Sequence, residues 1–344
     1  MLTTTINCPL MRIYYLLLII LSYLPLNAYS ENIIFSDEAL TQEVKLPEWF
    51  KLSFLDLKDD ITEAAEAKKK GLILYFGRKD CPYCKALIEK NWGRDDIRFY
   101  TQKHFDVVAI DTKGIKSVTD FDGFVFDEKQ YSLKMKTNFT PSLLFYNLEE
   151  KKVLRLTGYQ NPYRFMAALE YVADNHYKTI SYSDYLAQAE ESLDTNGNEF
   201  LNAEPYFDKP PFNLNRQYFS SERPLAVFFE KKFCHACDIL HAMPLQNDRV
   251  KNSLQDMDVI QLEINSSGPV ITPAGKKLTV KQWAKKLDLN YSPTIIFFDE
   301  AGKEIIRIDS VVWVNRLGRV LEYISTKAYI KHPDFQSWKI NTDK

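Results

Sequence analysis

An internal repeat constrains this chain more than any other feature of its sequence. When Cys81 is placed over Cys234, a shift of 153 residues (234 − 81), Cys84 falls on Cys237. One residue is lost after this motif, and the shift becomes 152 for the rest of the repeat. The other matches at these two shifts are Phe76 with Phe229, Leu87 with Leu240, Lys129 with Lys281, Asn138 with Asn290, Pro141 with Pro293, Phe145 with Phe297, Arg155 with Arg307, Leu169 with Leu321, and Tyr177 with Tyr329. The unit is about half of the 344 residues, so the sequence predicts a duplicated domain and not a solenoid.

Each unit alternates short apolar runs with amphipathic segments, as the first unit illustrates. Strands are predicted at residues 72–76, 105–110, 142–146 and 153–156, the last two forming an antiparallel hairpin. Helices are predicted at residues 59–70, 85–90, 127–136 and 162–174. The first of these helices is expected to end at Gly71, a favourable residue just beyond a helix. This order predicts an α/β fold in which a central mixed β-sheet is flanked by helices on both sides.

The N-terminus has the pattern of an export signal. Arg12 precedes an apolar run at residues 13–24, and small residues at 28–30 offer a cleavage site. The run is shorter than the ~20 residues of a membrane span. We therefore expect a cleavable signal peptide at residues 1–30 and a periplasmic or otherwise exported protein. An uncleaved signal that tethers the chain to the membrane is the alternative.

The remaining domain boundaries follow from the repeat and from composition. The first domain is predicted at residues 45–186 and the second at 214–340, with a linker at 187–213 that is rich in polar residues and proline. The net charge of −2, without a long run of one sign, argues against nucleic acid as a partner, because phosphate binding needs a concentrated basic surface.

Cysteine usage points to redox chemistry. Of the five cysteines, Cys8 lies in the signal, and the other four form two CxxC pairs. A disulfide within such a pair closes a very small loop and adds little to stability, so a structural staple is not favoured. A tetrahedral zinc site of four thiolates is the alternative, but it would require the two domains to dock active site to active site. The sequence therefore predicts no metal and no cofactor.

Both pairs follow a buried strand and begin a helix. Unpaired N–H groups and the positive end of the helix dipole stabilise a thiolate there, which lowers the pKa of the first cysteine. Cys81 and Cys234 are therefore the predicted nucleophiles. Cys84 and Cys237, three positions later, are the predicted resolving thiols that release a mixed-disulfide partner. Because a nucleophile must reach its substrate, we expect Cys81 to be open to solvent.

Residues between the cysteines are expected to tune the redox potential. Pro82 and Tyr83 form a glutaredoxin-type dipeptide, for which a potential of roughly −200 to −230 mV is expected. His235, when protonated, would stabilise the thiolate of Cys234 and make the second disulfide more oxidising. The alternative is a solvent-facing His235 without consequence.

The first unit resembles the SoxW-type thioredoxins, which are periplasmic proteins associated with sulfur-oxidation systems. The matching stretches cover most of residues 45–186: Pro47-Glu48-Trp49-Phe50, Ser53-Phe54-Leu55, Tyr75-Phe76-Gly77, Cys81-Pro82-Tyr83-Cys84-Lys85, Val118-Thr119-Asp120-Phe121-Asp122-Gly123, Phe139-Thr140-Pro141, Gly158-Tyr159 and Leu169-Glu170-Tyr171-Val172. The second unit is more divergent, and its Cys-His-Ala-Cys departs from the Cys-Pro-Tyr-Cys form.

This resemblance implies two tandem thioredoxin-like domains that exchange thiols and disulfides with periplasmic proteins. A reductant role, with electrons from a membrane thiol carrier and a link to sulfur-compound oxidation, is the implied activity. The resemblance also implies that Pro141 and Pro293 are cis and pack against the cysteines. The backbone of the preceding Thr140 and Ser292 would then be free to pair with an extended substrate.

One further expectation concerns proton transfer, and two alternative functions stay open. Ordinary thioredoxins have a buried acid six positions before the first cysteine, whereas this chain has Tyr75 and Phe228 there, so proton transfer must use water or another group. The chain could instead be an oxidase or isomerase of secreted proteins. In a third interpretation, the second domain binds partner proteins and its cysteines are idle.

Overall fold

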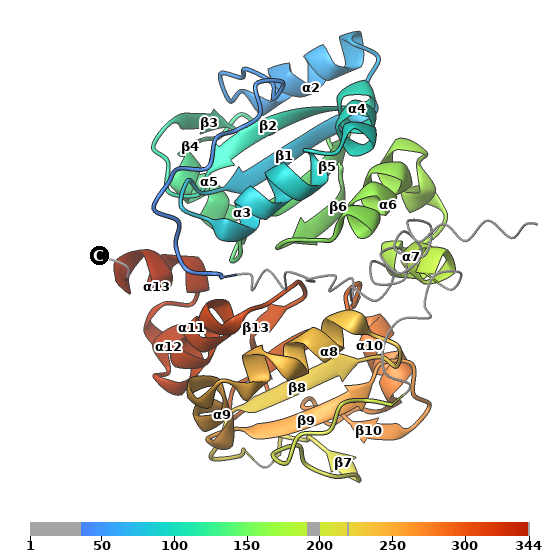
Figure 1. Ribbon diagram of the computed structural model, residues 1–344, viewed down its shortest axis with the longest axis vertical. Helices are drawn as coiled ribbons and strands as arrows, with labels where there is room; N and C mark the ends of the chain where they lie inside the picture. Colours follow the sequence, from blue (N-terminus) through green and yellow to red (C-terminus); the bar gives the residue numbers. More distant parts are fainter. Residues whose placement is uncertain (1–35, 191–199, 219, 343–344) are drawn as a thin grey trace, which may run out of the picture. The chain divides into compact units, whose positions relative to one another are not determined.

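The computed structural model describes residues 36–190, 200–218 and 220–342 (Figure 1). The predicted signal peptide at residues 1–30, and its alternative as a membrane tether, lie outside these ranges. In the part of the chain that is described, none of the helices has the length and apolar character needed to cross a membrane.

The first domain is built on a four-stranded mixed sheet with the order β2-β1-β5-β6 (Figure 1). The central strand β1 (Gly71–Gly77) runs parallel to β2 (Phe105–Asp111) and antiparallel to β5 (Ser142–Asn147). β5 then pairs with β6 (Lys152–Thr157) in the predicted antiparallel hairpin. Every residue of β1 is buried, as expected for a strand covered on both faces.

Helices cover both faces of this sheet, in agreement with the sequence prediction. The face of Leu72, Leu74 and Phe76 packs against α2 (Leu57–Glu66) and α5 (Glu128–Lys134). The opposite face packs against three helical segments through aromatic contacts that link Tyr75, Trp92 and Phe165. These segments are α3 (Pro82–Ala86) with its π-helical continuation η1 (Leu87–Asn91), α4 (Asp95–His104) and α6 (Pro162–Ala173).

Two elements of this domain were not predicted from the sequence, and one local prediction was wrong. α4 was not predicted, because it buries only Ile97 and Thr101 and therefore has a weak apolar pattern. The hairpin of β3 (Ser117–Thr119) and β4 (Val125–Asp127) was also missed, because its strands are only three residues long. Gly71 does not follow a helix: α2 ends earlier, and Gly71 begins β1. A Cβ atom at Gly71 would lie 2.0 Å from the carbonyl oxygen of Tyr146 on β5, so close strand pairing explains this glycine.

The second domain repeats this architecture with the strand order β13-β12-β8-β9. Its strands are β8 (Leu225–Glu230), β9 (Asp258–Glu263), β12 (Thr294–Phe298) and β13 (Glu304–Ile308). The covering helices are α8 (His235–Ala242), α9 (Asp248–Gln255), α10 (Val280–Lys286) and α11 (Val314–Ser325). In place of a helix like α2, the two-residue strand β7 (Phe212–Asn213) pairs with β10 (Pro269–Ile271), which pairs with β11 (Lys277–Thr279).

Short elements complete the chain and connect its two domains. α7 (Tyr182–Glu190) and the 3₁₀ turns η2 (His176–Lys178) and η3 (Pro244–Gln246) lie on connections, and α12 (Ala328–Lys331) and α13 (Phe335–Thr342) follow α11. The side chain of Gln336 in α13 donates a hydrogen bond of 3.2 Å to the backbone oxygen of Thr112 in the first domain. The ring of Phe335 packs 5.5 Å from that of Phe139, which places a residue of the first domain in the hydrophobic core of the second.

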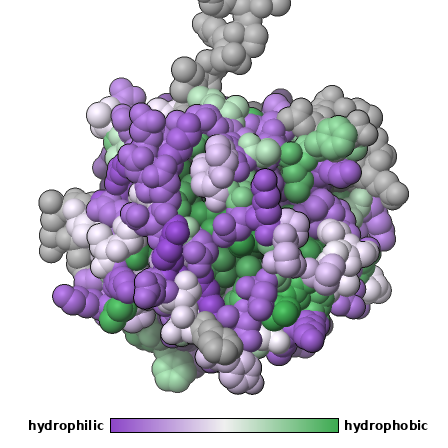
Figure 2. All heavy atoms as spheres, turned by 90° about the horizontal axis from the view of Figure 1, so that it is seen from below, coloured by the Kyte–Doolittle hydropathy of each residue, from purple (hydrophilic) through white to green (hydrophobic). Residues whose placement is uncertain are grey.

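The surface seen from below is mainly hydrophilic, with hydrophobic residues gathered in a hollow near the middle (Figure 2). Charged side chains make up 26% of the sequence and carry nearly balanced charges of both signs, 44 basic against 46 acidic.

Candidate active site

Cys81 lies where the chain passes from β1 into a helix, as predicted. It has extended backbone angles and is the residue before α3, whose first position is Pro82. The backbone N–H of Cys84 donates to the sulfur of Cys81 over 3.1 Å. Proline is well suited to the first helical position because it lacks an N–H group that would be unpaired there. The sulfur of Cys81 thus replaces a conventional N-cap oxygen and accepts from the helix N-terminus.

The loop around Pro141 lies directly against Cys81. The Thr140–Pro141 and Ser292–Pro293 peptide bonds are both cis, as the family resemblance implied. The hydroxyl of Thr140 donates to the sulfur of Cys81 over 3.2 Å, and the sulfur lies 3.5 Å from the backbone oxygen of Thr140. Two hydrogen-bond donors, the Thr140 hydroxyl and the Cys84 N–H, therefore converge on this sulfur.

These contacts separate the acidities of the two thiols. Burial raises the pKa of Cys81, but hydrogen bonds with Cys84 and Thr140 and the positive charges of Arg316 and Arg78 outweigh it and lower this pKa to about 6. Burial and the neighbouring Cys81 raise the pKa of Cys84 well above its usual value. At neutral pH the pair therefore holds one thiolate, on Cys81, and one thiol, on Cys84.

Contrary to the sequence expectation, Cys81 is not open to solvent. Only 2% of its surface is exposed. The reason is that the second domain lies opposite it. Cys81 and Thr140 line one side of a cleft of about 420 Å³, and Arg316 and Phe335 of the second domain line the other side. A contact between residues so far apart in the chain has no signature in the local sequence.

Tyr83 lies beside the cysteines and also contacts the second domain, so it helps to cover Cys81. Its hydroxyl donates to the carboxylate of Asp37 over 3.0 Å and accepts from the backbone N–H of Trp313 over 3.0 Å. The guanidinium of Arg316 stacks 3.6 Å from the centre of its ring. The tuning role predicted for Tyr83 and Pro82 remains a prediction, but the contacts of Tyr83 also connect the first site to the second domain.

The residue six positions before Cys81 is placed to handle protons. Tyr75 is buried, and its side chain forms a hydrogen bond with Cys84, which lowers the raised pKa of Cys84. Tyr75 also lines a cavity of about 370 Å³ that borders Gly77 and Lys79. A Cβ atom at Gly77 would lie 2.3 Å from the Tyr75 hydroxyl, so glycine leaves room for the phenol. The hydroxyl therefore donates to the sulfur of Cys84, and the cavity lies beside the phenol as a route for the proton that Cys84 gives up.

We predict that Tyr75→Phe slows the release of a mixed disulfide by at least about tenfold, because general acid–base groups typically contribute more than this. The other repeat carries Phe228 at this position, so phenylalanine is compatible with the fold. Single-turnover kinetics by rapid mixing would measure the step. Tyr131→Phe, which removes a buried hydroxyl from the opposite face of the sheet, is the matched control. An equal effect of both substitutions would contradict the role of Tyr75.

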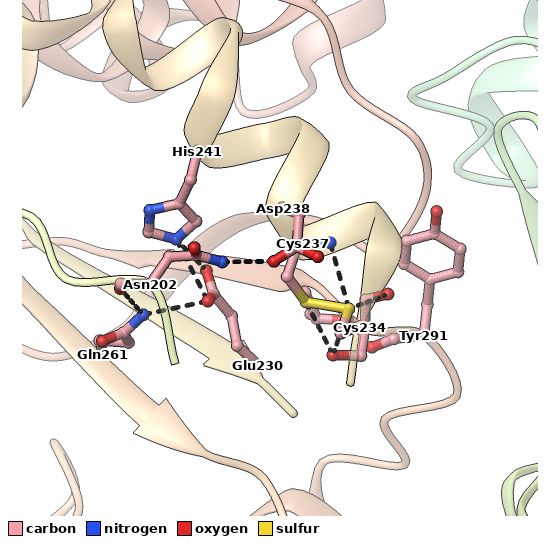
Figure 3. The surroundings of a disulfide bond; sticks show 10 residues. Asn202, Glu230, Cys234, Cys237, Asp238, His241, Gln261 and Tyr291 are labelled. Carbon is pink, nitrogen blue, oxygen red and sulfur yellow. Dashed lines mark hydrogen bonds and ion pairs between the residues drawn. A yellow bond between two sulfur atoms is a disulfide. The ribbon is translucent and has the colours of Figure 1, made fainter. Parts of the chain in front are cut away.

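The second cysteine pair occupies the equivalent place in its domain. Cys234 is the N-cap of α8 and is joined to Cys237 by a disulfide. The hydroxyl of Ser292 lies 3.7 Å from the sulfur of Cys234 and 3.5 Å from that of Cys237 (Figure 3). His235 is exposed. The structure thus brings Cys234, Cys237, Ser292 and the cis proline together, and the redox effect of His235 stays a prediction.

A buried charged cluster lies beside the second pair and was missed by sequence reasoning. Glu230 is completely buried, and its carboxylate lies 3.0 Å from Nε2 of His241 (Figure 3). Nδ1 of His241 lies 2.9 Å from the carboxylate of Glu204. Burial lowers the pKa of His241, but the two carboxylates outweigh this and raise it above its usual value. Glu230 takes the repeat position of Gly77 (77 + 153 = 230), and this glycine-to-glutamate difference is the sequence signal that could have identified it.

A four-thiolate zinc site was the alternative interpretation of the two CxxC pairs. Across the described ranges, His, Cys, Asp and Glu side chains do not gather in any group of three that could hold a metal ion. In addition, Cys234 and Cys237 are bonded to each other. The described residues therefore do not offer the ligand set that the zinc interpretation requires.

A comparison with protein families identifies the type of both domains. A family model described as a thioredoxin-like domain matches twice, at residues 57–173 and 216–325. No curated protein matches the chain. Similar solved structures include a thioredoxin-fold protein from Helicobacter pylori, with 22% identity over 36% of this chain and 82% of that one and a TM-score of 0.31. A DsbH oxidoreductase has 14% identity over 38% and 92%, with a TM-score of 0.26, and a disulphide isomerase from Xylella fastidiosa Temecula1 has 18% identity over 39% and 88%, with a TM-score of 0.23.

Proposed function

The chain belongs to the family of proteins with thioredoxin-like domains and is in general terms a thiol–disulfide oxidoreductase, and we propose that it reduces disulfides of exported proteins. The observation that carries this proposal is the sulfur of Cys81 at a helix start, where two hydrogen-bond donors and two positive charges favour the thiolate. A low thiol pKa is the property that makes a cysteine an effective nucleophile at neutral pH.

The proposed reaction has two exchange steps. The thiolate of Cys81 attacks one sulfur of the substrate disulfide, forming a mixed disulfide and releasing the other substrate sulfur as a thiolate. Cys84 then loses its proton through Tyr75 and attacks Cys81. The Cys81–Cys84 disulfide forms, and the substrate leaves as a dithiol. The protein has given up two electrons, so a membrane thiol carrier is the proposed donor that restores it.

The proposed compartment is the periplasm. The export signal predicted at residues 1–30 supports this proposal. The resemblance of the first unit to SoxW-type thioredoxins supports a link to the oxidation of sulfur compounds. Exported proteins with disulfides are the proposed substrates.

Two alternative functions have separate tests, and a specific observation favours the first. The disulfide between Cys234 and Cys237 favours the alternative of an oxidase or isomerase through its oxidase activity, which requires a site that is held oxidised. Measured potentials well above that of thioredoxin, which is about −270 mV, would favour this function over a reductase. In the other alternative the second domain only binds partners. Replacing Cys234 and Cys237 by serine would then weaken partner binding and leave the exchange activity intact.

The proposed function can be tested by trapping its substrates. In a Cys84→Ser, Cys237→Ser variant, neither mixed disulfide can be resolved, so the partners should remain covalently attached. Expression in the native host, followed by non-reducing electrophoresis and mass spectrometry, would identify them. We expect exported proteins with disulfides, bound through Cys81. A variant that also carries Cys81→Ser and Cys234→Ser is the control, and capture of no exported protein by the trapping variant would contradict the proposal.

A further inference from the structure

The two domains contact each other through residues that are equivalent in the repeat. Arg164 and Arg316 are related by the shift of 152 residues (164 + 152 = 316). Arg316 lies 5.2 Å from the ring of Phe139, which precedes Thr140. Arg164 lies 4.8 Å from the ring of Tyr291, which precedes Ser292. Phe139 and Tyr291 are also equivalent (139 + 152 = 291). The arginine of each domain therefore contacts the aromatic residue of the other domain, as in a two-fold symmetric interface.

The contact near the centre of this interface also joins equivalent positions. A Cβ atom built on Gly158 would lie 2.3 Å from the hydroxyl oxygen and 2.5 Å from the Cβ atom of Ser310. These residues match at the same shift (158 + 152 = 310), and Ser310 is completely buried. Only a residue without a side chain at position 158 allows this approach, so the interface depends on that glycine.

Arg316 makes the most direct contact with the first active site. Its Nη2 donates to the backbone oxygen of Thr140 over 2.8 Å, and the sulfur of Cys81 lies 3.5 Å from that same oxygen. The backbone N–H groups of Asn315 and Arg316 donate to Asp37 over 3.0 and 2.8 Å. The backbone oxygen of Thr140, one of the groups that an extended substrate was expected to use, is therefore already occupied by Arg316.

We propose that Arg316 is a positioning residue of the first active site supplied by the second domain, where it stabilises the Cys81 thiolate and closes the Thr140 backbone to protein substrates. A protein substrate then reaches Cys81 only after the second domain withdraws. This inference rests on the proposed function. The cleft of about 420 Å³ has the size of a small-molecule site, and Arg316 occupies the Thr140 oxygen on its wall, which supports the closing role.

The thiolate is influenced by groups from every element around it. Cys84 and Tyr75 act from its own domain, and Arg78, at the end of β1, adds a positive charge that is shared with Asp80. The second domain places four basic residues around the cleft, Arg249, Arg316, Arg319 and Lys339, and Arg316 is the one among them that ranks with the main influences on Cys81. Removal of Arg316 alone should therefore change the ionisation of Cys81 and leave the other groups in place.

The charge role is tested with Arg316→Gln in a chain that also carries Cys8→Ser, Cys234→Ser and Cys237→Ser. The pH dependence of iodoacetamide reaction gives the midpoint of Cys81 ionisation. We expect a midpoint near 6 without the arginine substitution and a rise of about one unit or more with it. Arg319→Gln, which removes the same charge one turn further along α11, is the matched control and should shift the midpoint much less. Arg316→Lys, which keeps the charge, should restore most of the low midpoint.

The closing role is tested with Gly158→Val, which places a side chain against Ser310. The measurement is the ratio of the rates at which a small maleimide and a maleimide coupled to a polymer of several kilodaltons modify Cys81. We expect the wild-type protein to exclude the large reagent by at least about tenfold, and Gly158→Val to remove most of this difference. Gly123→Val is the control, because Gly123 also has positive φ (83° against 70°) but has no atom within 4 Å of its added Cβ.

The outcomes separate the inference from the proposed function. An unchanged midpoint in Arg316→Gln, or a wild-type protein that admits the large reagent as readily as the small one, overturns the inference and leaves the function standing. If Cys81 of the wild-type protein ionises like the thiol of a free peptide, the proposed function itself fails. Circular dichroism of each variant confirms that it is folded.

Discussion

In a chain that also carries Cys234→Ser and Cys237→Ser, replacing Cys81 by serine is expected to lower the rate of disulfide reduction by at least about a thousandfold. Serine has no ionisable group in this pH range, so the helix start, the Thr140 hydroxyl and the arginine charges have no thiolate to stabilise. The structure gives the reaction no other sulfur in the first site that can begin it, because Cys84 is fully buried and its pKa is raised. Reduction of insulin with dithiothreitol as the electron source is a direct assay.

A control variant and a pH profile show whether the loss of activity comes from the Cys81 thiolate. Cys8→Ser should leave the rate unchanged, because this cysteine lies outside both CxxC pairs. The wild-type rate should rise with pH through about 6, the pKa of Cys81, and this rise should be absent in Cys81→Ser. If Cys81→Ser retains more than a tenth of the wild-type rate, the first site is not where the reaction begins.

His241→Leu is expected to destabilise the second domain by about 3 kcal/mol or more at pH 6. The substitution removes the positive partner of Glu230 and leaves that carboxylate completely buried, with the amide of Gln261 as its remaining hydrogen-bond donor. Taking one partner from a buried ion pair is costly, because the other charge loses its compensation and cannot regain water. Urea unfolding followed by circular dichroism would measure the change.

The effect of His241→Leu should depend on pH in one direction. The pKa of His241 in the folded protein is above that of the unfolded chain, because Glu230 and Glu204 favour the charged imidazole. Its contribution to stability is therefore complete below the unfolded pKa of about 6.5 and is lost as the pH rises through the folded value. The difference between wild-type and His241→Leu should be larger at pH 6 than at pH 9.

His235→Leu is the matched control, since His235 lies on the same helix and is exposed. It should change the unfolding free energy by no more than about 0.5 kcal/mol at either pH. A destabilisation by His241→Leu that is independent of pH would show that the imidazole only fills space. That result would contradict the ion pair, whereas equal effects of both histidine substitutions would contradict the importance of the buried cluster.

The repeat and the placement of the cysteine pairs were readable from the sequence because they depend on local and periodic patterns. Buried strands such as residues 72–76 are continuous apolar runs, and hairpins follow from runs that are separated by short polar turns. A CxxC pair that follows such a strand and precedes a helix can be placed at the start of that helix from the flanking residues alone. Elements with weak patterns, such as α4 and the β3–β4 hairpin, were missed for the same reason.

The sequence by itself thus determined two thioredoxin-like units, each with a helix-start cysteine pair and a proline loop. Only the tertiary structure decided that Cys81 is covered, that Tyr75 meets Cys84, and that Glu230 is buried with His241. The cover depends on Arg316, which lies 235 residues after Cys81 (316 − 81) and belongs to no motif. Contacts of this kind arise because two folded surfaces match in shape and charge, and the order of residues along either surface does not record which groups will meet.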